Sequence, residues 1–218
     1  MFKLALKIAW ASVTRRRTRS VLLILMISLS LWGLLFMEGF YEGMYEQLIS
    51  NAIRSDSGHL SLFGKGYRLD PDLSNWIKDD TELNDFLAGD IRVKSYVKRL
   101  QQDGLVATAH YSRGTSILGV DLTAEERHGH LAGYLYKGEY TFGNKDQGTI
   151  IGYKLANKLQ VRVGSKIILS AQDSQGEVSA TSLKVTGILK TNNMALDENA
   201  VFIGEKQMRK LLAVERGI

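Results

Sequence analysis

An uncharged apolar run preceded by arginines constrains this chain more than any other feature of its sequence. Residues 21–37 read VLLILMISLSLWGLLFM, which is 17 residues without a charged side chain. A helix of this length, at about 1.5 Å per residue, is just long enough to cross a bilayer core of about 30 Å. Aromatic residues at 40, 41 and 45 follow it, as is typical of the membrane–water interface. The run therefore predicts a transmembrane helix.

Four arginines directly before the run set its expected orientation: Arg15, Arg16, Arg17 and Arg19. Because basic residues favour the cytoplasmic side of a membrane, we expect a cytoplasmic N-terminus in the bacterial inner membrane and a main domain that is extracytoplasmic or periplasmic. A buried helix of a soluble core would not need these arginines. A secretory signal peptide normally ends in a small-residue cleavage site, whereas residues 38–42 read EGFYE.

The basic charge of the chain is concentrated at its start. Six of the 28 basic residues lie in residues 1–20, which hold no acidic residue, so the other 22 are balanced by 23 acidic ones. This distribution argues against a nucleic-acid partner, because duplex binding needs a basic surface on the folded domain. We expect residues 1–17 to form an amphipathic helix at the lipid surface, with this apolar face: Phe2, Leu4, Ala5, Ile8, Ala9 and Val13.

The helical pattern continues beyond the apolar run, so we expect one transmembrane helix and stalk over residues 18–54. Large apolar side chains recur on one side of it at spacings of three and four, and this stripe comprises Met37, Phe40, Tyr41, Met44 and Leu48. Such a stripe predicts contact with a partner helix or with cargo. Gly39 and Gly43 stand four residues apart, which permits close helix approach.

Shorter segments after residue 54 predict an α+β domain with two lobes, at 55–137 and 138–218. We expect a strand at 57–63, a helix at 81–88, and strands at 93–101, 105–110 and 115–120, separated by turns at Asp103-Gly104 and Arg113-Gly114. The second lobe is expected to contain a strand, a helix and a returning strand between residues 149 and 171.

Candidate catalytic and metal sites are poor. The chain has no cysteine and no phosphate-binding P-loop. Three weaker patterns are interpreted as turns or solvated loops: Gly64-Lys65-Gly66, His128-Gly129-His130 beside Glu125 and Glu126, and Asp70 with Asp72. Ser57 and His59 lack a nucleophile elbow and an orienting acid, so they do not predict acyl transfer. We therefore expect no catalytic residue, no cofactor and no metal in this chain.

Several motifs resemble the N-terminal portion of FtsX-like ABC transporter permeases, which include lipoprotein-releasing and macrolide-exporter (MacB-like) branches. The resemblance covers nearly all 218 residues and rests on these segments: FKLALKIAW at 2–10, EGMYEQLISNAI at 42–53, SGHL at 57–60, LGVD at 118–121, GEY at 138–140, IIGYKLANKLQVRVGSKI at 150–167 and VFI at 201–203. The block at 150–167 is the most specific, because it fixes a strand, a helix and a returning strand in order.

The resemblance implies a non-catalytic permease subunit with a MacB-like periplasmic core. A partner ATPase would bind ATP and Mg²⁺. A second permease chain, identical or different, would pair with the stalk. ATP-driven movement of the stalk would transport lipoproteins or other amphiphilic cargo. Such permeases have three further spans, and nothing after Ile53 could span a bilayer, so the chain is expected to be an N-terminal half. The alternatives are a single-pass membrane-anchored extracytoplasmic adaptor or sensor and, last, a membrane-anchored hydrolase.

Overall fold

The computed structural model describes residues 2–52, 58–69, 75–129, 131–143, 145–191, 193–215 and 217. The chain divides into two units, Met1–Ser50 and Asn51–Ile218. Each unit is described by itself below.

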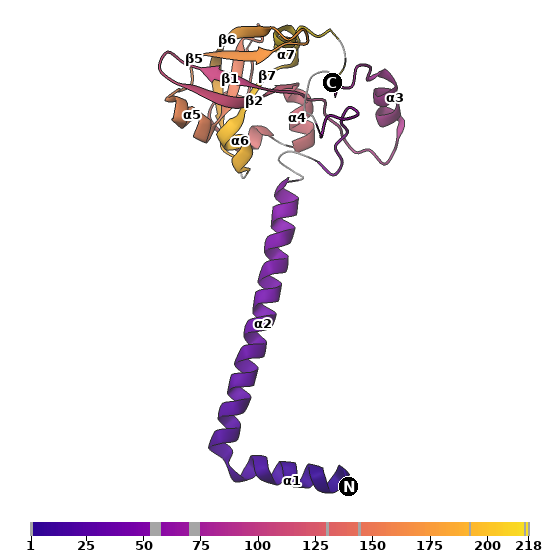
Figure 1. The fold of residues 1–218 in the computed structure, drawn as a ribbon, viewed down its shortest axis with the longest axis vertical. Helices are drawn as coiled ribbons and strands as arrows, with labels where there is room; N and C mark the ends of the chain where they lie inside the picture. The colour runs from indigo at the N-terminus through magenta and orange to yellow at the C-terminus, as the bar shows by residue number, and fades with distance from the viewer. Residues whose placement is uncertain are drawn as a thin grey trace. The chain divides into compact units, whose positions relative to one another are not determined.

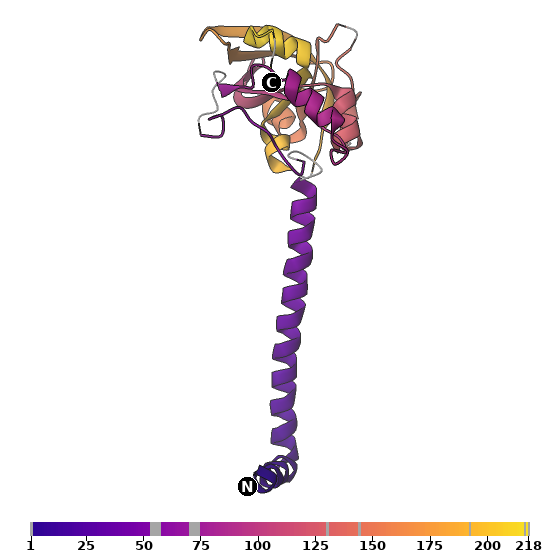
Figure 2. The same cartoon turned by 90° about the vertical axis from the view of Figure 1, so that its right-hand side faces the viewer.

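The first unit consists of two helices, α1 (Phe2–Arg15) and α2 (Arg17–Ala52). The chain turns sharply between them, and α2 then continues as one uninterrupted helix (Figures 1 and 2). The Ser20 hydroxyl donates a hydrogen bond of 2.8 Å across this turn to the Val13 carbonyl oxygen. These helices correspond to those expected at 1–17 and 18–54, although residues 1, 53 and 54 lie outside the described residues.

The apolar side chains of α2 are exposed on every side of the helix. Leu25, Leu29 and Trp32 are each more than half exposed, as are most of their neighbours. Within the described part of the chain, α2 is the one helix long and apolar enough to cross a membrane, by length and composition. A helix that is hydrophobic all round needs lipid or other protein to cover it.

The second unit is built on a seven-stranded sheet of order β3-β6-β4-β7-β2-β1-β5. A further pairing of β5 with β6 closes six of the strands into a ring, with β3 attached outside it. The strands are β1 (Leu100–Ala107), β2 (Ser112–Val120), β3 (Leu135–Gly138), β4 (Gly148–Gly152), β5 (Lys166–Gln172), β6 (Val178–Leu189) and β7 (Ala200–Gly204). The helices are α3 (Thr81–Gly89), α4 (Leu122–Gly129), the 3₁₀ helix η3 (Leu131–Tyr134), α5 (Tyr153–Leu159), α6 (Met194–Asn199) and α7 (Glu205–Leu212).

The expected boundary between residues 137 and 138 does not separate two sheets. β2, from the first expected lobe, pairs in parallel with β7, from the second, so that Ser116 lies opposite Ala200. β1 pairs in turn with β5, with Gly104 opposite Ala171. These pairings join residues more than 60 positions apart, and local sequence patterns do not report such distant partners.

The turn expected at Asp103-Gly104 is also wrong, because β1 runs straight through both residues. A Cβ atom added at Gly104 would overlap the Ser170 carbonyl oxygen. Glycine is therefore needed here for the close approach of β5 rather than for a turn. The chain reverses instead at residues 108–111, where Thr108 Oγ1 accepts a hydrogen bond from the Tyr111 amide, and β2 includes the second expected turn, Arg113-Gly114.

The two faces of the sheet carry separate hydrophobic clusters, and the central strands are buried on both. Ile151 belongs to the cluster covered by α5 and α7, whereas its neighbour Ile150 belongs to the cluster covered by η3 and α6. Every residue of β4 and β7 is buried. The strand, helix and returning strand expected between 149 and 171 are confirmed as β4, α5 and β5, and the helix expected at 81–88 as α3. The strand expected at 57–63 is not formed over the described residues 58–63.

We expect Gly152→Ala to lower the free energy of unfolding by about 1–3 kcal/mol. Gly152 joins β4 to α5, and an added Cβ would overlap the carbonyl oxygens of Leu196 and Asp197 in α6. Gly114→Ala is the matched control, because a Cβ there meets no atom within 4 Å. Urea unfolding of the detergent-solubilised full chain measures both, and equal stability of the two variants would contradict this packing.

Candidate functional site

The outer half of α2 carries the expected stripe on one side of the helix. At about 100° per residue, its five members fall within a sector of about 100°. Met37 is 50% exposed and Met44 is 40% exposed, so no described residue covers the stripe substantially. The other members, Phe40, Tyr41 and Leu48, are each more than half exposed. The structure thus brings the five residues together as an open, helix-borne surface.

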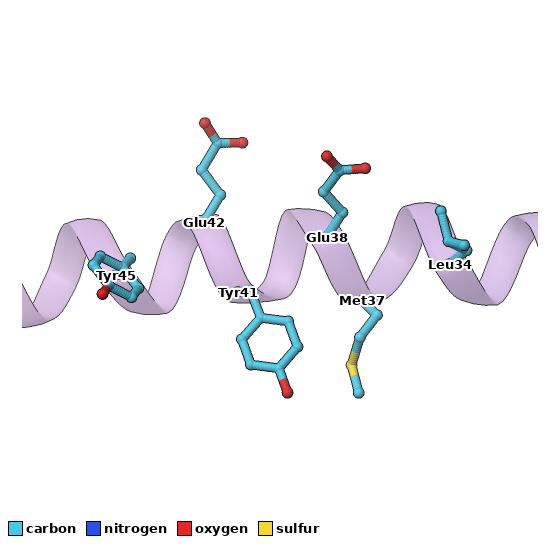
Figure 3. A pocket seen from close by; sticks show the side chains of 6 residues that line it. All are labelled: Leu34, Met37, Glu38, Tyr41, Glu42 and Tyr45. Carbon is cyan, nitrogen blue, oxygen red and sulfur yellow. The ribbon is translucent and has the colours of Figure 1, made fainter.

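Acidic residues occupy a different side of the same helix. Figure 3 shows Met37 and Tyr41 projecting one way while Glu38 and Glu42 project the other. Glu46 follows Glu42 after one further turn. The residues drawn in Figure 3 line an open hollow along a single helix, not an enclosed cavity. An apolar stripe beside an acidic ridge suits contact with another helix or with an amphiphile better than chemistry.

Gly39 and Gly43 form a third, smooth side of α2. A Cβ added at either position would meet no atom within 4 Å. The backbone there is open to close approach by a partner helix, as small residues four apart allow.

The expected topology-setting arginines lie where the two helices of the first unit meet. Arg15 ends α1, Arg16 is the residue between the helices, Arg17 begins α2, and Arg19 lies in the first turn of α2. All four side chains are exposed. Their charge is therefore free to contact solvent or lipid headgroups at the start of the apolar run.

A buried ion pair organises the segment between α3 and the sheet. Arg99 binds the Glu125 carboxylate through two hydrogen bonds, Nε to Oε1 at 2.5 Å and Nη2 to Oε2 at 2.8 Å. The Glu125 side chain is only 1% exposed and that of Arg99 18%. Burial, followed by the charges of Glu125 and Glu126, raises the pKa of the nearby Tyr140 hydroxyl. Glu125 is thus a structural partner of Arg99, not a candidate metal ligand.

One serine–histidine contact was missed by the sequence reasoning. The Ser95 hydroxyl lies 3.2 Å from Nδ1 of His128; Ser95 is exposed and His128 is partly buried. The two residues are 33 positions apart, so no local sequence motif predicts the contact. Among the described residues, no group of three His, Cys, Asp or Glu side chains could hold a metal. His130, Ser57, Asp70 and Asp72 lie outside the described residues.

The remaining pattern from the sequence, Gly64-Lys65-Gly66, is a local turn. Tyr67 donates its amide hydrogen bond to the Gly64 carbonyl oxygen at 3.1 Å, and Gly66 takes a positive φ of 91°. This geometry agrees with the interpretation of the glycines as turn residues.

Comparison with known proteins connects these features to one family. The family model described as "MacB-like periplasmic core domain" matches residues 20–216, which is most of the chain. The match begins inside α2 and continues through nearly all of the second unit. No curated protein sequence matches the chain.

Two solved structures are similar in fold. The extracellular domain of the noncanonic ABC-type transporter YknZ from Gram-positive bacteria is 16% identical, with a TM-score of 0.47, over 67% of this chain and 71% of that one. The periplasmic region of MacB from Actinobacillus actinomycetemcomitans is 10% identical, with a TM-score of 0.43, over 74% of this chain and 64% of that one. Neither is similar enough to carry residue roles across.

We expect Glu125→Gln to lower the free energy of unfolding by about 2 kcal/mol, somewhat below the value for a fully buried pair because Arg99 retains some exposure. The substitution keeps the size of the side chain but removes the charge that neutralises the guanidinium. Glu198→Gln is the control, because Glu198 pairs with Lys154 and Lys158 at the surface and surface pairs contribute little. Urea unfolding measures the free energy of unfolding of both variants. A larger decrease for Glu198→Gln than for Glu125→Gln would refute the assignment of Arg99–Glu125 as the stabilising buried pair.

Proposed function

We propose that this chain, which belongs to the family of MacB-like periplasmic core domains, is the permease subunit of an ABC transporter whose energy comes from a partner ATPase. The observation that carries the proposal is the family match over residues 20–216. A single family model thus includes both the apolar helix and the α+β domain. The arginines before that helix supply the orientation that such a subunit needs.

In the proposed arrangement, α2 crosses the cytoplasmic membrane with its N-terminal end in the cytoplasm. α1 lies in the headgroup plane on that side, with Lys3 and Lys7 toward anionic lipid. The second unit lies outside the cytoplasm. The four arginines hold this orientation because moving them across the bilayer would be strongly unfavourable.

The proposed role of the outer part of α2 is to transmit movement. The helix is 36 residues long, or about 54 Å at about 1.5 Å per residue, and it contains no proline that would kink it. A displacement at its cytoplasmic end would therefore reach its outer end. ATP and Mg²⁺ would be bound by the partner ATPase, and movement of the stalks would transport amphiphilic cargo such as a lipoprotein.

The proposed partner of the stripe is the stalk of a second permease chain. Exposed apolar side chains gain free energy when they are removed from water, at about 25 cal/mol per Å². The acidic ridge at 38, 42 and 46 would remain at the solvated side. Gly39 and Gly43 lie on a different side of the helix, so they would suit a second helix contact rather than the stripe itself.

The test of the proposal is isolation of the full chain from its native membrane in mild detergent. We expect an ABC ATPase with a P-loop to co-purify in stoichiometric amount and to hydrolyse ATP in the complex. A chain that purifies without an ATPase, yet binds an extracytoplasmic ligand by itself, would favour the single-pass adaptor or sensor instead.

The orientation generates its own prediction. Protease added to the outside of spheroplasts should cleave the second unit, and protease added to inside-out vesicles should leave it intact. Changing Arg15, Arg16, Arg17 and Arg19 together to Gln should make a substantial fraction of chains resistant from the outside, because the orientation signal is lost. The control, Lys206→Gln with Lys210→Gln on α7, removes exposed charge without altering protection; cleavage only from the cytoplasmic side would reject the topology.

The stripe predicts a position-specific effect on assembly. Leu48→Asp should reduce recovery of the second permease chain about tenfold, because a carboxylate would be buried against apolar side chains. Ile49→Asp makes the same chemical change at the neighbouring residue, which is similarly exposed but lies about 100° around the helix. With Ile49→Asp, the amount of second permease chain recovered should stay near that obtained with the unaltered chain. Quantitative co-purification measures this amount. Equal effects of both variants would argue against a packed stripe.

A further inference from the structure

A cationic and aromatic hollow lies on the second unit, and its lining residues take no part in the features used above. Its volume is about 580 Å³, and none of its ten lining side chains is acidic. β3 contributes Tyr136 and Lys137, α5 contributes Tyr153 and Asn157, and the segment after α5 contributes Arg162. The remaining lining residues are Ala156, Gln160, Val161, Val163 and Ile188.

Two tyrosines of the lining position Lys137, which also lines the hollow, and Lys190, which lies beside it against both rings. The rings of Tyr136 and Tyr153 meet edge to face with centroids 5.1 Å apart. Lys137 Nζ lies 5.2 Å from the centre of the Tyr136 ring. Lys190 Nζ lies 5.8 Å from the same ring and 5.5 Å from that of Tyr153. Such cation–π contacts hold an ammonium group in place without neutralising its charge.

The cations at the hollow lack ion-pair partners in the described part of the chain. Among the described residues, Lys137, Lys190 and Arg162 form no ion pair. Their neighbours on α5 differ, because Lys154 and Lys158 both pair with Glu198, at 2.9 and 3.4 Å. Apart from residues 1–20, the chain carries slightly more acidic than basic residues, so this concentration of unpaired cations is local.

β3 adds an unoccupied main-chain edge beside the hollow. It stands at the end of the strand order and, among the described strands, pairs only with β6. An edge strand can accept an added strand through its free N–H and C=O groups. Lys137 on that edge would repel the same edge of a second copy, but it would attract an acidic strand.

We propose that this hollow and the edge of β3 bind an acidic, extended segment of a partner protein. Carboxylates of the segment contact Lys137, Lys190 and Arg162, and its main chain pairs with β3. A lipid surface fits less well, because Lys137 and Arg162 line a depression together with amide side chains, whereas lipid binding favours a protruding apolar face. All these residues belong to the second unit, so the proposal does not depend on how α2 crosses the membrane.

The test uses the full chain in nanodiscs of zwitterionic lipid and the peptide acetyl-(Glu-Thr)₄-amide, in which every glutamate falls on one side of an extended strand. The peptide should bind, the matched (Gln-Thr)₄ peptide should not, and raising the salt concentration should weaken binding. Lys137→Gln with Lys190→Gln should weaken binding at least about tenfold, whereas Lys206→Gln with Lys210→Gln should not.

Hydrogen exchange tests the main-chain pairing separately, because attraction between charges alone would not protect the amides of β3. On peptide binding, amides within Leu135–Gly138 should gain protection, because an added strand would occupy the free edge. Absence of binding, equal loss in both double variants, or binding without protection of β3 would overturn the proposal. So would displacement of the peptide by equimolar inorganic phosphate, or tighter binding of the chain to vesicles of anionic lipid than to the peptide.

Discussion

The constraint on which the arrangement depends is that α2 cannot leave its apolar surface in water. The run 21–37 has large apolar side chains on all sides, and they are mostly more than half exposed in this chain. Burying one such side chain fully is worth about 1.5–3 kcal/mol, so the complete run represents tens of kcal/mol that only lipid or other apolar helices could supply. The backbone of α2 is compatible with lipid because its N–H and C=O groups are paired within the helix.

The second unit meets the opposite requirement, because it must bury its apolar surface by itself. Closing β5 onto β6 gives a ring of strands in which β4 and β7 are covered on both faces. Gly104 and Gly152 mark places where two backbones approach so closely that no Cβ could fit. The core of this unit therefore depends on contacts between segments far apart in sequence, and not on any one lobe.

The parts predicted correctly from sequence are those whose signal is local. A run of apolar residues is enough to predict α2, and the spacing of residues 150–167 is enough to predict β4, α5 and β5 in order. The features missed are those that tertiary contacts decide. Asp103-Gly104 has the composition of a turn, but the approach of Ser170 holds it in a strand.

The candidate sites divide in the same way. The stripe on α2 could be predicted because one helix places all its residues. The contact of Ser95 with His128, and the group formed by Lys137, Arg162 and Lys190, could not, because the fold brings these residues together from separate segments.

The two concentrations of positive charge differ in the chemistry that they can perform. The arginines before α2 are exposed and lie within five residues of one another, from 15 to 19, which suits a diffuse interaction with headgroups. Lys137 and Lys190 are instead held by tyrosine rings beside a strand edge, and each therefore loses less side-chain entropy when a ligand binds. Charges held at fixed positions favour partners whose opposite charges have a matching spacing. Charges at a membrane surface act mainly through the total number of positive charges. On the two proposals made above, basic residues at one place would set an orientation and those at the other would select a partner.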